Sequence, residues 1–369
     1  MSPCMLGILE QAGDRTTVRV VRVTMRRIAL LCVLCITWLG GFAASAYGTS
    51  YQIRELSVAG TAVVGPSWAN AINNSGRVAG VVYDSVTSYA AVTNSLGQWQ
   101  LLDEGFGLGI NGSGQVVGYA DGAALWDAAG SVTHLPLPEG ALFSQGVGTN
   151  DAGCIVGECW LGTGHVDNYV AVWNGAPMPT ILGAGCANAV NTAGTVAGFV
   201  KDAGGNHQAF VWAPSGGMTT LAGGVSSEAN AINDFGQVAG TVCDGAGTWA
   251  CVWSPTGSLT LLANISDAIS STAYGINKSG AIVGSCDTAE GTFAILWQPD
   301  GAPVGLGWLA GDVGGVAYGI NDLGQIAGCS VDYFGDPRAV VWDPIPEPAS
   351  VLAVVAGLVA LAPRLRRRG

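Results

Sequence analysis

The side chains that most often carry chemistry are few and scattered in this 369-residue chain. Its three histidines, His134, His165 and His207, lie in different stretches and share no motif. A metal site needs clustered ligands, and a catalytic triad needs a nucleophile, a base and an orienting group within reach. No G-x-S-x-G, H-E-x-x-H or P-loop pattern is present. The sequence therefore predicts no catalytic residue, no metal site and no cofactor.

Carboxylates are plentiful, and their number excludes some partners. Residues 47–345 contain 23 Asp and Glu but only five Lys and Arg, which leaves a net charge of −18. Such a surface repels nucleic acid and anionic lipid, and it tolerates cations and neutral sugars. A pair of carboxylates across a channel would suit a carbohydrate-active hydrolase or lyase, which stays an alternative. Because no pair stands out among 23, we predict that the protein is not an enzyme.

Many polar residues belong to a phrase that recurs along the chain, as in "GINDLGQIAG" from Gly319 and "GINGSGQVVG" from Gly109. Seven copies align on an Asn, and each has a Gly three residues later. Neighbouring copies are 38 to 44 residues apart, a period typical of propeller blades. The Asn–Gly pairs are Asn73–Gly76, Asn111–Gly114, Asn150–Gly153, Asn191–Gly194, Asn233–Gly236, Asn277–Gly280 and Asn321–Gly324.

Each copy of the phrase predicts a tight hairpin. Asn-x-x-Gly suits a type I turn in which Asn bonds its own backbone and Gly takes a positive φ. The residues two and four before the Asn are Ala or Gly in every copy, so the strand before the turn should be crowded, like the innermost strand of a blade. Acidic residues follow three of the Asn, at Asp151, Asp234 and Asp322. Turn capping explains them better than Ca²⁺, because the dense Asp spacing of a calcium loop is missing.

A third strand ends in Trp about twenty residues after most of the Asn, and packing between sheets explains these Trp better than sugar binding. The first copy has Thr93 instead. Trp160 and Trp308 fall outside this register near predicted loops, and they are the candidate ligand contacts. The Trp in register are Trp126, Trp173, Trp212, Trp253, Trp297 and Trp342.

The pattern predicts an all-β fold: a seven-bladed β-propeller of four-stranded blades over residues 47–343. The last copy has no fourth strand after Trp342, and the first is preceded by a lone strand within residues 51–60. We expect that N-terminal strand to complete the last blade and close the ring, which protects the sheet edges. An open β-solenoid is the alternative, but it needs polar caps that the sequence lacks.

The first 46 residues read as a secretory signal. Two arginines precede an apolar run over residues 28–42, and Ala44-Ser45-Ala46 forms a small-x-small cleavage site. The alternative is a permanent membrane anchor, for which the run is short against the roughly 20 residues of a span. Residues 1–24 do not look like a signal, so Met25 is a candidate for the true start.

Residues 344–369 combine Pro-Glu-Pro, twelve apolar residues over 351–362, and arginines. Twelve residues span roughly 18 Å as a helix, against a hydrocarbon core of about 30 Å, so any membrane contact should be transient. This order resembles the PEP-CTERM sorting signal of Gram-negative bacteria. The resemblance implies an exosortase as partner, removal of the tail, and export to the cell surface or extracellular matrix. A simple tail anchor is the alternative. The motif residues are Pro346, Glu347, Pro348, Arg364, Arg366, Arg367 and Arg368.

"HQAFVW", from His207 to Trp212, resembles the HAF family of extracellular repeats, although Gln208 is inserted into its His-Ala-Phe block. The Gly-Ile-Asn-Asp-x-Gly-Gln block matches better. The resemblance covers about residues 60–342. It implies a secreted bacterial repeat protein and no established activity.

Seven cysteines remain once the signal is removed, and export permits disulfides. Cys243 and Cys251 flank a short turn on adjacent strands, so they are the best candidate pair. The odd number leaves at least one free thiol.

Together these features predict an exported, non-catalytic surface or matrix protein that binds an exopolysaccharide or a protein partner through propeller loops. A purely structural surface protein is the alternative. The loops between second and third strands vary most in length, from residues 119–123 to residues 158–168.

Mass spectrometry of the exported protein tests both ends. We expect a mature chain that begins after Ala46 and lacks Arg366–Arg368, because signal cleavage and sorting remove both segments. A mature protein that keeps Arg366–Arg368 would contradict sorting, and a precursor peptide from upstream of Met25 would contradict that start.

Overall fold

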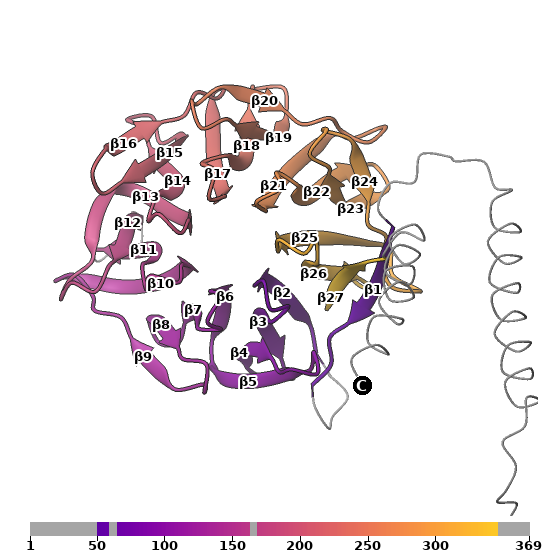
Figure 1. The fold of residues 1–369 in the computed structure, drawn as a ribbon, viewed down its shortest axis with the longest axis horizontal. Helices are drawn as coiled ribbons and strands as arrows, with labels where there is room; N and C mark the ends of the chain where they lie inside the picture. The colour runs from indigo at the N-terminus through magenta and orange to yellow at the C-terminus, as the bar shows by residue number, and fades with distance from the viewer. Residues whose placement is uncertain (1–49, 59–64, 163–167, 346–369) are drawn as a thin grey trace, which may run out of the picture. The chain divides into compact units, whose positions relative to one another are not determined.

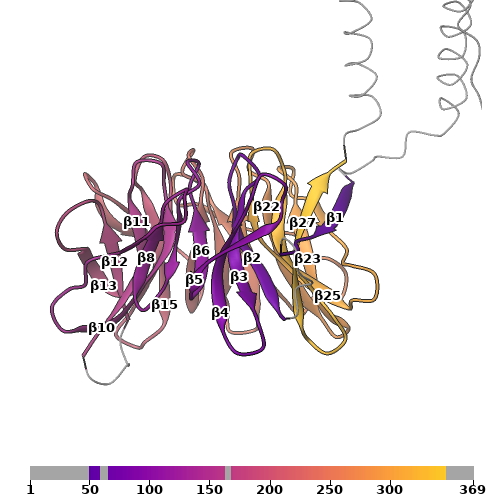
Figure 2. The ribbon, with the colours of Figure 1, turned by 90° about the horizontal axis from the view of Figure 1, so that it is seen from below.

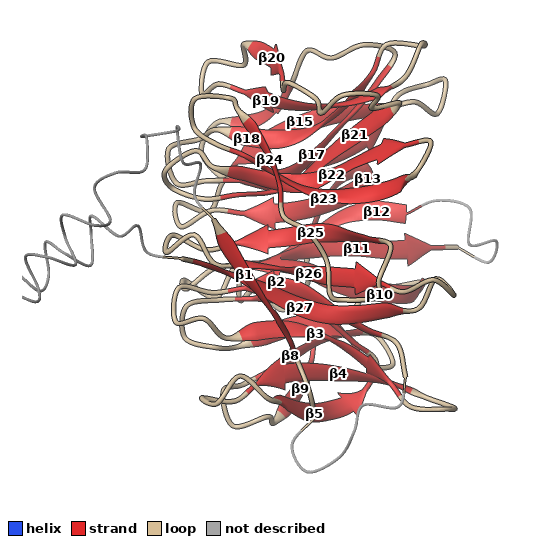
Figure 3. Ribbon diagram, turned by 90° about the vertical axis from the view of Figure 1, so that its right-hand side faces the viewer, coloured by secondary structure: helices blue, strands red, loops and turns tan. Residues whose placement is uncertain are grey.

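The computed structural model describes residues 50–58, 65–162 and 168–345. The chain divides into two units, Met1–Gly48 and Thr49–Gly369, and the described residues belong to the second. Every regular element in this part is a β-strand, and all pairs of named strands are antiparallel. Figure 3 shows only strands and loops among the described residues. The predicted all-β class is confirmed.

The strands form six sheets that stand around a common axis, with one edge of each sheet toward the centre (Figure 1). From the inner edge outward, the four-stranded sheets are β2 (Ser67–Ile72), β3 (Val78–Tyr83), β4 (Ser88–Thr93), β5 (Trp99–Glu104); β6 (Phe106–Ile110), β7 (Val116–Tyr119), β8 (Ala123–Trp126), β9 (Val132–His134); β17 (Ser226–Ile232), β18 (Val238–Cys243), β19 (Thr248–Trp253), β20 (Leu259–Leu261); β21 (Ser270–Ile276), β22 (Ile282–Thr288), β23 (Gly291–Trp297), β24 (Pro303–Gly305); and β25 (Gly314–Ile320), β26 (Ile326–Val331), β27 (Pro337–Pro344), β1 (Tyr51–Glu55).

The sixth sheet has seven strands because one long strand serves two groups. Its order is β10 (Ala141–Thr149), β11 (Ile155–Leu161), β12 (Asn168–Trp173), β13 (Thr180–Val190), β14 (Val196–Lys201), β15 (His207–Ala213), β16 (Gly217–Thr220). The first half of β13, Thr180–Ala184, pairs with β12. The second half, Gly185–Val190, pairs with β14 as an inner strand.

The predicted hairpins are present in all seven copies. Each Gly donates its backbone N–H to the carbonyl of the repeated Asn, as Gly324 does to Asn321 at 3.1 Å. The φ angles of these glycines lie between 76° and 84°, a region that residues with a Cβ rarely adopt. The prediction of an Asn-initiated turn with positive φ at Gly is confirmed.

A β-bulge interrupts every innermost strand, which the periodic pattern did not indicate. The register with the second strand shifts three residues before each repeated Asn, as between Ala317 and Gly319 in β25, and β10 has a further shift between Ala141 and Phe143. Opposite the bulge lies a second repeated glycine, seven residues after each Asn; Gly284 is one of them. A Cβ there would overlap the carbonyl oxygen of the paired strand, Thr272 in that copy. These glycines are therefore required by close backbone approach rather than by a turn.

The Trp side chains of the third strands pack between neighbouring sheets, as expected. Trp126, Trp253, Trp297 and Trp342 are fully buried, and each indole N–H donates to an oxygen in the preceding sheet or the chain leaving it. In the first copy Trp99 takes this place. Trp99 lies opposite Thr93 in the strand register and is 1% exposed. Its ring packs against Gly80, the glycine opposite the bulge, just as Trp253 and Trp342 pack against Gly240 and Gly328.

The N-terminal strand pairs with the last part of the ring. β1 is the outer strand beside β27, with Tyr51 opposite Pro344 (Figure 1). The chain then crosses to the first sheet, where the backbone N–H of Trp99 donates to the carbonyl of Ser57. Leu56 is buried at this crossing, 2% exposed. The segment 51–58 thus joins the last sheet to the first.

Gly284→Ala and Gly153→Ala test the two classes of glycine. Gly284→Ala should lower the free energy of unfolding by about 3 kcal/mol, because its methyl group must displace backbone. Gly153 has no atom within 4 Å of an added Cβ, so the cost there is the strain of φ +81°, roughly 1–2 kcal/mol. Urea unfolding of both variants measures the difference, and equal losses would contradict this assignment.

Candidate functional site

A ring of asparagine side chains surrounds the axis at the hairpin end of the inner strands. Each repeated Asn donates Nδ2–H to the backbone carbonyl of the next repeated Asn, at 2.9 to 3.2 Å. The last of them, Asn321, donates to the first, Asn73, at 2.9 Å. All seven side chains are buried, 3% to 7% exposed. This ring joins every inner hairpin to its neighbour.

The same side chain also caps its own turn. In all seven copies Oδ1 accepts the backbone N–H of the residue four positions later, for example Gln325 N at 2.9 Å from Asn321. The sequence predicted this local bond but not the one between sheets. The only available signal was that every copy has Asn, although Asp would cap a turn equally well. An Asp lacks the donor that the neighbouring carbonyl needs.

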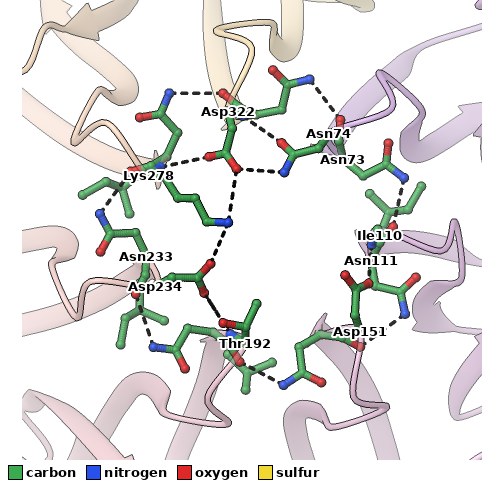
Figure 4. Close-up of a pocket in the computed structure, with 18 of the residues that line it drawn as sticks. Asn73, Asn74, Ile110, Asn111, Asp151, Thr192, Asn233, Asp234, Lys278 and Asp322 are labelled. Atoms are coloured by element: carbon green, nitrogen blue, oxygen red, sulfur yellow. Dashed lines mark hydrogen bonds and ion pairs between the residues drawn. The ribbon is translucent and has the colours of Figure 1, made fainter.

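The residues directly after the Asn form a polar mouth around a cavity of about 300 Å³ (Figure 4). Lys278 Nζ lies 3.2 Å from Asp234 Oδ2 and 3.8 Å from Asp322 Oδ2. Asp322 also exchanges hydrogen bonds with Asn74. At such exposed positions an ion pair is worth about 0–1 kcal/mol, so the mouth is held mainly by the buried asparagines behind it.

The acidic turn residues do not cap their own turns as predicted. Asp151, Asp234 and Asp322 each accept the backbone N–H of the equivalent residue in the preceding copy, as Asp234 does from Thr192 at 3.0 Å. The reason is that the Asn already satisfies the local donors. No group of three or more His, Cys, Asp and Glu among the described residues is arranged to hold a metal ion.

A second cavity of about 480 Å³ lies deeper along the axis, and we call it the channel cavity. Its lining includes the bulged residue of every inner strand. These residues differ between copies, so one side of the wall is apolar and the other carries amide and phenol groups. The bulged residues are Asn70, Leu108, Val147, Asn188, Asn230, Tyr274 and Tyr318.

Glu228 contributes the one carboxylate of the channel cavity's lining. Its Oε1 lies 2.6 Å from Nδ1 of His207, whose ring stacks on Phe199 at 3.9 Å between centroids. The sequence pattern gave His207 no role beyond its repeat motif. Its partner Glu228 lies 21 residues further along the chain, so no local motif indicated this contact. With a single carboxylate, the lining of this cavity does not match the paired-carboxylate site of a glycosidase.

Two tyrosines stand near this carboxylate. The rings of Tyr274 and Tyr318 lie 5.5 Å apart. Burial raises the pKa of both hydroxyls, and the nearby carboxylates of Asp287 and Glu228 raise that of Tyr274 further. Both therefore keep the hydroxyl proton at neutral pH, and the Tyr318 hydroxyl accepts from the Cys329 thiol at 3.9 Å.

The end of the ring opposite the asparagines carries a row of aromatic side chains, which we call the aromatic row. It comprises Phe106, Tyr119, Phe143 and Trp160, and neighbouring rings lie 5.0 to 6.2 Å apart. All four side chains are partly exposed. Tyr119 and Trp160 fall within residues 119–123 and 158–168, the two stretches that the sequence marked as most different in length.

Beside the row, a cleft of about 730 Å³ opens between the first two sheets. It is lined by Phe106 and Tyr119 together with the carboxylates of Asp103, Glu104 and Asp121. Asp103 already accepts the indole N–H of Trp126 at 2.8 Å. The cleft thus combines aromatic faces with hydrogen-bond acceptors.

The two Trp predicted as ligand contacts are not brought together. Trp160 belongs to the aromatic row, 5.4 Å from Phe143 between centroids. Trp308 is 39% exposed and packs near Phe293, at 5.3 Å, on another sheet. Phe106, Tyr119 and Phe143 were missed, since single aromatic residues in strands carry no signal of a shared surface.

The predicted Cys243–Cys251 disulfide is absent, and all seven cysteines from Cys154 to Cys329 are free. The register places Cys243 opposite Thr248, and Cys251 opposite Gly240. The two thiols are therefore three rungs apart, beyond the reach of a disulfide. Burial, aided by the charge of Glu158, raises the pKa of the Cys159 thiol to about 11, so it stays protonated at neutral pH.

The predicted signal over residues 1–46, and the sorting motif from Pro346 to Arg368, lie outside the described residues. No helix in the described part of the chain is long and apolar enough to cross a membrane.

Comparison with known proteins identifies the fold. No family model and no curated protein matches the chain. A catalytically inactive virginiamycin B lyase from Staphylococcus aureus, solved with quinupristin, is 11% identical over 80% of this chain and 100% of its own, with a TM-score of 0.52. A puromycin hydrolase is 12% identical, with a TM-score of 0.55, over 81% of this chain and 55% of its own. This chain thus spans about half the length of that hydrolase. At such identities the similarity shows the fold alone, which is of β-propeller type.

The prediction that the protein is not an enzyme is wrong on this comparison. It rested on missing motifs and on the absence of a distinguishable pair among the 23 carboxylates. The solved structures that share the fold include a lyase and a hydrolase. The absence of a short sequence motif therefore does not decide activity, because one fold hosts many functions.

Asn191 variants test the asparagine ring. Asn191→Ala removes the turn cap and the bond to Asn233, and it should lower the free energy of unfolding by about 3 kcal/mol. Asn191→Asp keeps the capping oxygen but loses the donor, so we expect it to be destabilised as well. Thr192→Val, which loses only an exposed bond to Asp234, should cost less than about 1 kcal/mol. Chemical denaturation measures all three, and a fully stable Asn191→Asp would contradict a role for Nδ2.

Proposed function

We propose that the six sheets constitute a propeller of seven four-stranded blades. The count follows if β13 is divided between two blades, because its two halves pair with different strands. β1 then completes the blade of β25–β27, and the bond from Asn321 to Asn73 joins the seventh blade to the first. Figure 2 shows the ring edge-on, with β1 beside β27.

We propose further that the protein is exported to the surface or extracellular matrix of a Gram-negative bacterium, where it binds a neutral polysaccharide. The N-terminal signal and the PEP-CTERM-like tail support export, with an exosortase-type enzyme as the processing partner. The HAF-like repeats support the same setting. Membrane contact would then be limited to the tail before its removal.

The observation that carries the binding proposal is the aromatic row with its adjoining cleft. Sugar rings present C–H faces that pack on aromatic rings, and hydroxyl groups that donate to carboxylates. Phe106 and Tyr119 face the same cleft as Glu104 and Asp121. A net charge of −18 over residues 47–345 favours a neutral polymer over an anionic one.

The position of the termini agrees with this surface as the binding face. Tyr51 and Pro344 lie next to Gly324 of the last hairpin turn, so both ends of the ring leave on the asparagine side. The aromatic row is at the opposite ends of the strands. A tail that holds the protein at the membrane would therefore leave the row open to polymer.

Affinity electrophoresis of the exported protein in gels containing xylan, mannan or β-glucan tests the proposal. We expect at least one polymer to retard the protein. Phe143→Ala should weaken binding about tenfold, a loss of about 1.4 kcal/mol, because it interrupts the row.

The matched control is Phe235→Ala. Phe235 is 66% exposed and follows an asparagine on the opposite side, so its removal should leave retardation unchanged. Equal effects of both variants would show that exposed aromatic area alone matters. A protein that no neutral polymer retards, and that the producer's own exopolysaccharide does not retain, would overturn the proposal.

A further inference from the structure

The channel cavity has a lining unlike that of the cleft. It contains one carboxylate, from Glu228, and three aromatic rings, from Phe199, Tyr274 and Tyr318. No Lys or Arg is among its lining residues. The residues with the carboxylate and the aromatic rings come from four consecutive copies of the repeat. The polar side of the cavity is therefore continuous.

The carboxylate is held in place and keeps an oxygen available. Oε1 of Glu228 lies 2.6 Å from Nδ1 of His207, so the side chain is anchored through this one oxygen. Oε2 has no hydrogen-bond partner among the described residues. The side chain is 38% exposed, so a ligand in the cavity can reach it.

The aromatic rings bring electron-rich faces to the same wall. Tyr274 and Tyr318 lie 5.5 Å apart and stay un-ionised, and Phe199 is fixed by its stacking on His207. The faces of such rings attract a cation within about 6 Å. An ammonium group also donates N–H bonds, which suits carbonyl oxygens such as those of the asparagine side chains.

Those asparagines are already oriented. Asn188 and Asn230 each donate Nδ2–H to a backbone carbonyl of the next inner strand, at 3.0 and 2.9 Å. Their donors are thus partly used, and Oδ1 of Asn230 also accepts from Nδ2 of Asn188 at 3.4 Å. The wall therefore offers acceptors and π faces, and it includes no Lys or Arg.

The net negative charge of the protein also favours a cationic ligand. The net charge of −18 over residues 47–345 lowers the potential in the channel, which concentrates cations and repels anions. A neutral sugar carries no charge to offset that of the Glu228 carboxylate, whereas an ammonium group does. An anionic ligand would be repelled by the carboxylate of Glu228, and no Lys or Arg lines the cavity to offset that repulsion.

We propose that the channel cavity binds an organic ammonium group, with Glu228 as its counter-ion and Tyr274, Tyr318 and Phe199 as its aromatic walls. The group belongs either to an amino sugar or to a small free amine, and both present the same chemistry. This site is separate from the aromatic row, and it stands whether or not the row binds a neutral polymer.

Isothermal titration of the exported protein distinguishes the two sources. The probes are a glucosamine tetramer, ethanolamine and an N-acetylglucosamine tetramer, the last being the neutral match of the first. We expect an ammonium probe to bind at least tenfold more tightly than the neutral tetramer. Binding of the glucosamine tetramer alone assigns the site to an amino sugar, and binding of ethanolamine assigns it to a small amine.

Glu228→Gln should weaken ammonium binding at least tenfold, because it removes the charge and keeps the shape. Glu290→Gln is the matched control: Glu290 is exposed in a turn after β22 and should have no effect. Tyr274→Leu provides a second test, with a smaller loss expected, should Glu228→Gln fail to fold. Phe143→Ala should leave ammonium binding intact, which separates this site from the polysaccharide proposal.

The proposal is overturned if neither ammonium probe binds, if the N-acetylated tetramer binds as tightly, or if folded Glu228→Gln binds like the unmodified protein.

Discussion

The arrangement of the sheets depends on the buried side-chain amide of the repeated Asn. The repeated Asn accepts N–H groups of its own turn through Oδ1 and donates Nδ2–H to the next copy's carbonyl. A sheet of four short strands cannot bury both of its faces alone, so each must be held against two neighbours. Because the bond passes from each copy to the next and from the last to the first, the correct neighbour spacing is set for all copies together.

Close approach of the inner strands follows from this constraint. Backbones at the axis are near enough that a Cβ at Gly109 would lie 2.6 Å from the carbonyl oxygen of Val147 in the next inner strand. The positions two and four before the Asn are therefore small. The bulge between them leaves one residue per strand free of the ladder, and that residue is where the copies are allowed to differ.

Departures from the repeat are consequently the places to look for ligands. Tyr274 and Tyr318 occupy a position where the other copies have apolar or amide side chains, and Glu228 is the one carboxylate at its position in the repeat. Phe106, Tyr119 and Phe143 likewise gather where two adjacent copies differ from the rest. Not every departure is functional: Thr93 in place of Trp is offset by Trp99 from the next strand, which fills the same space.

The sequence by itself determined the strand order, the hairpin turns, the crowded inner strands and the pairing of the N-terminal strand with the last sheet. Each of these depends on local backbone geometry or on the count of copies, which periodicity reports directly. Only the tertiary structure decided the register that separates Cys243 from Cys251, the bulge that turns Tyr274 into the channel, and the contact between His207 and Glu228. The asparagine bond from Asn321 to Asn73 spans 248 residues. Such contacts depend on how neighbouring sheets pack, and a linear pattern carries no record of which side chains face each other across that gap.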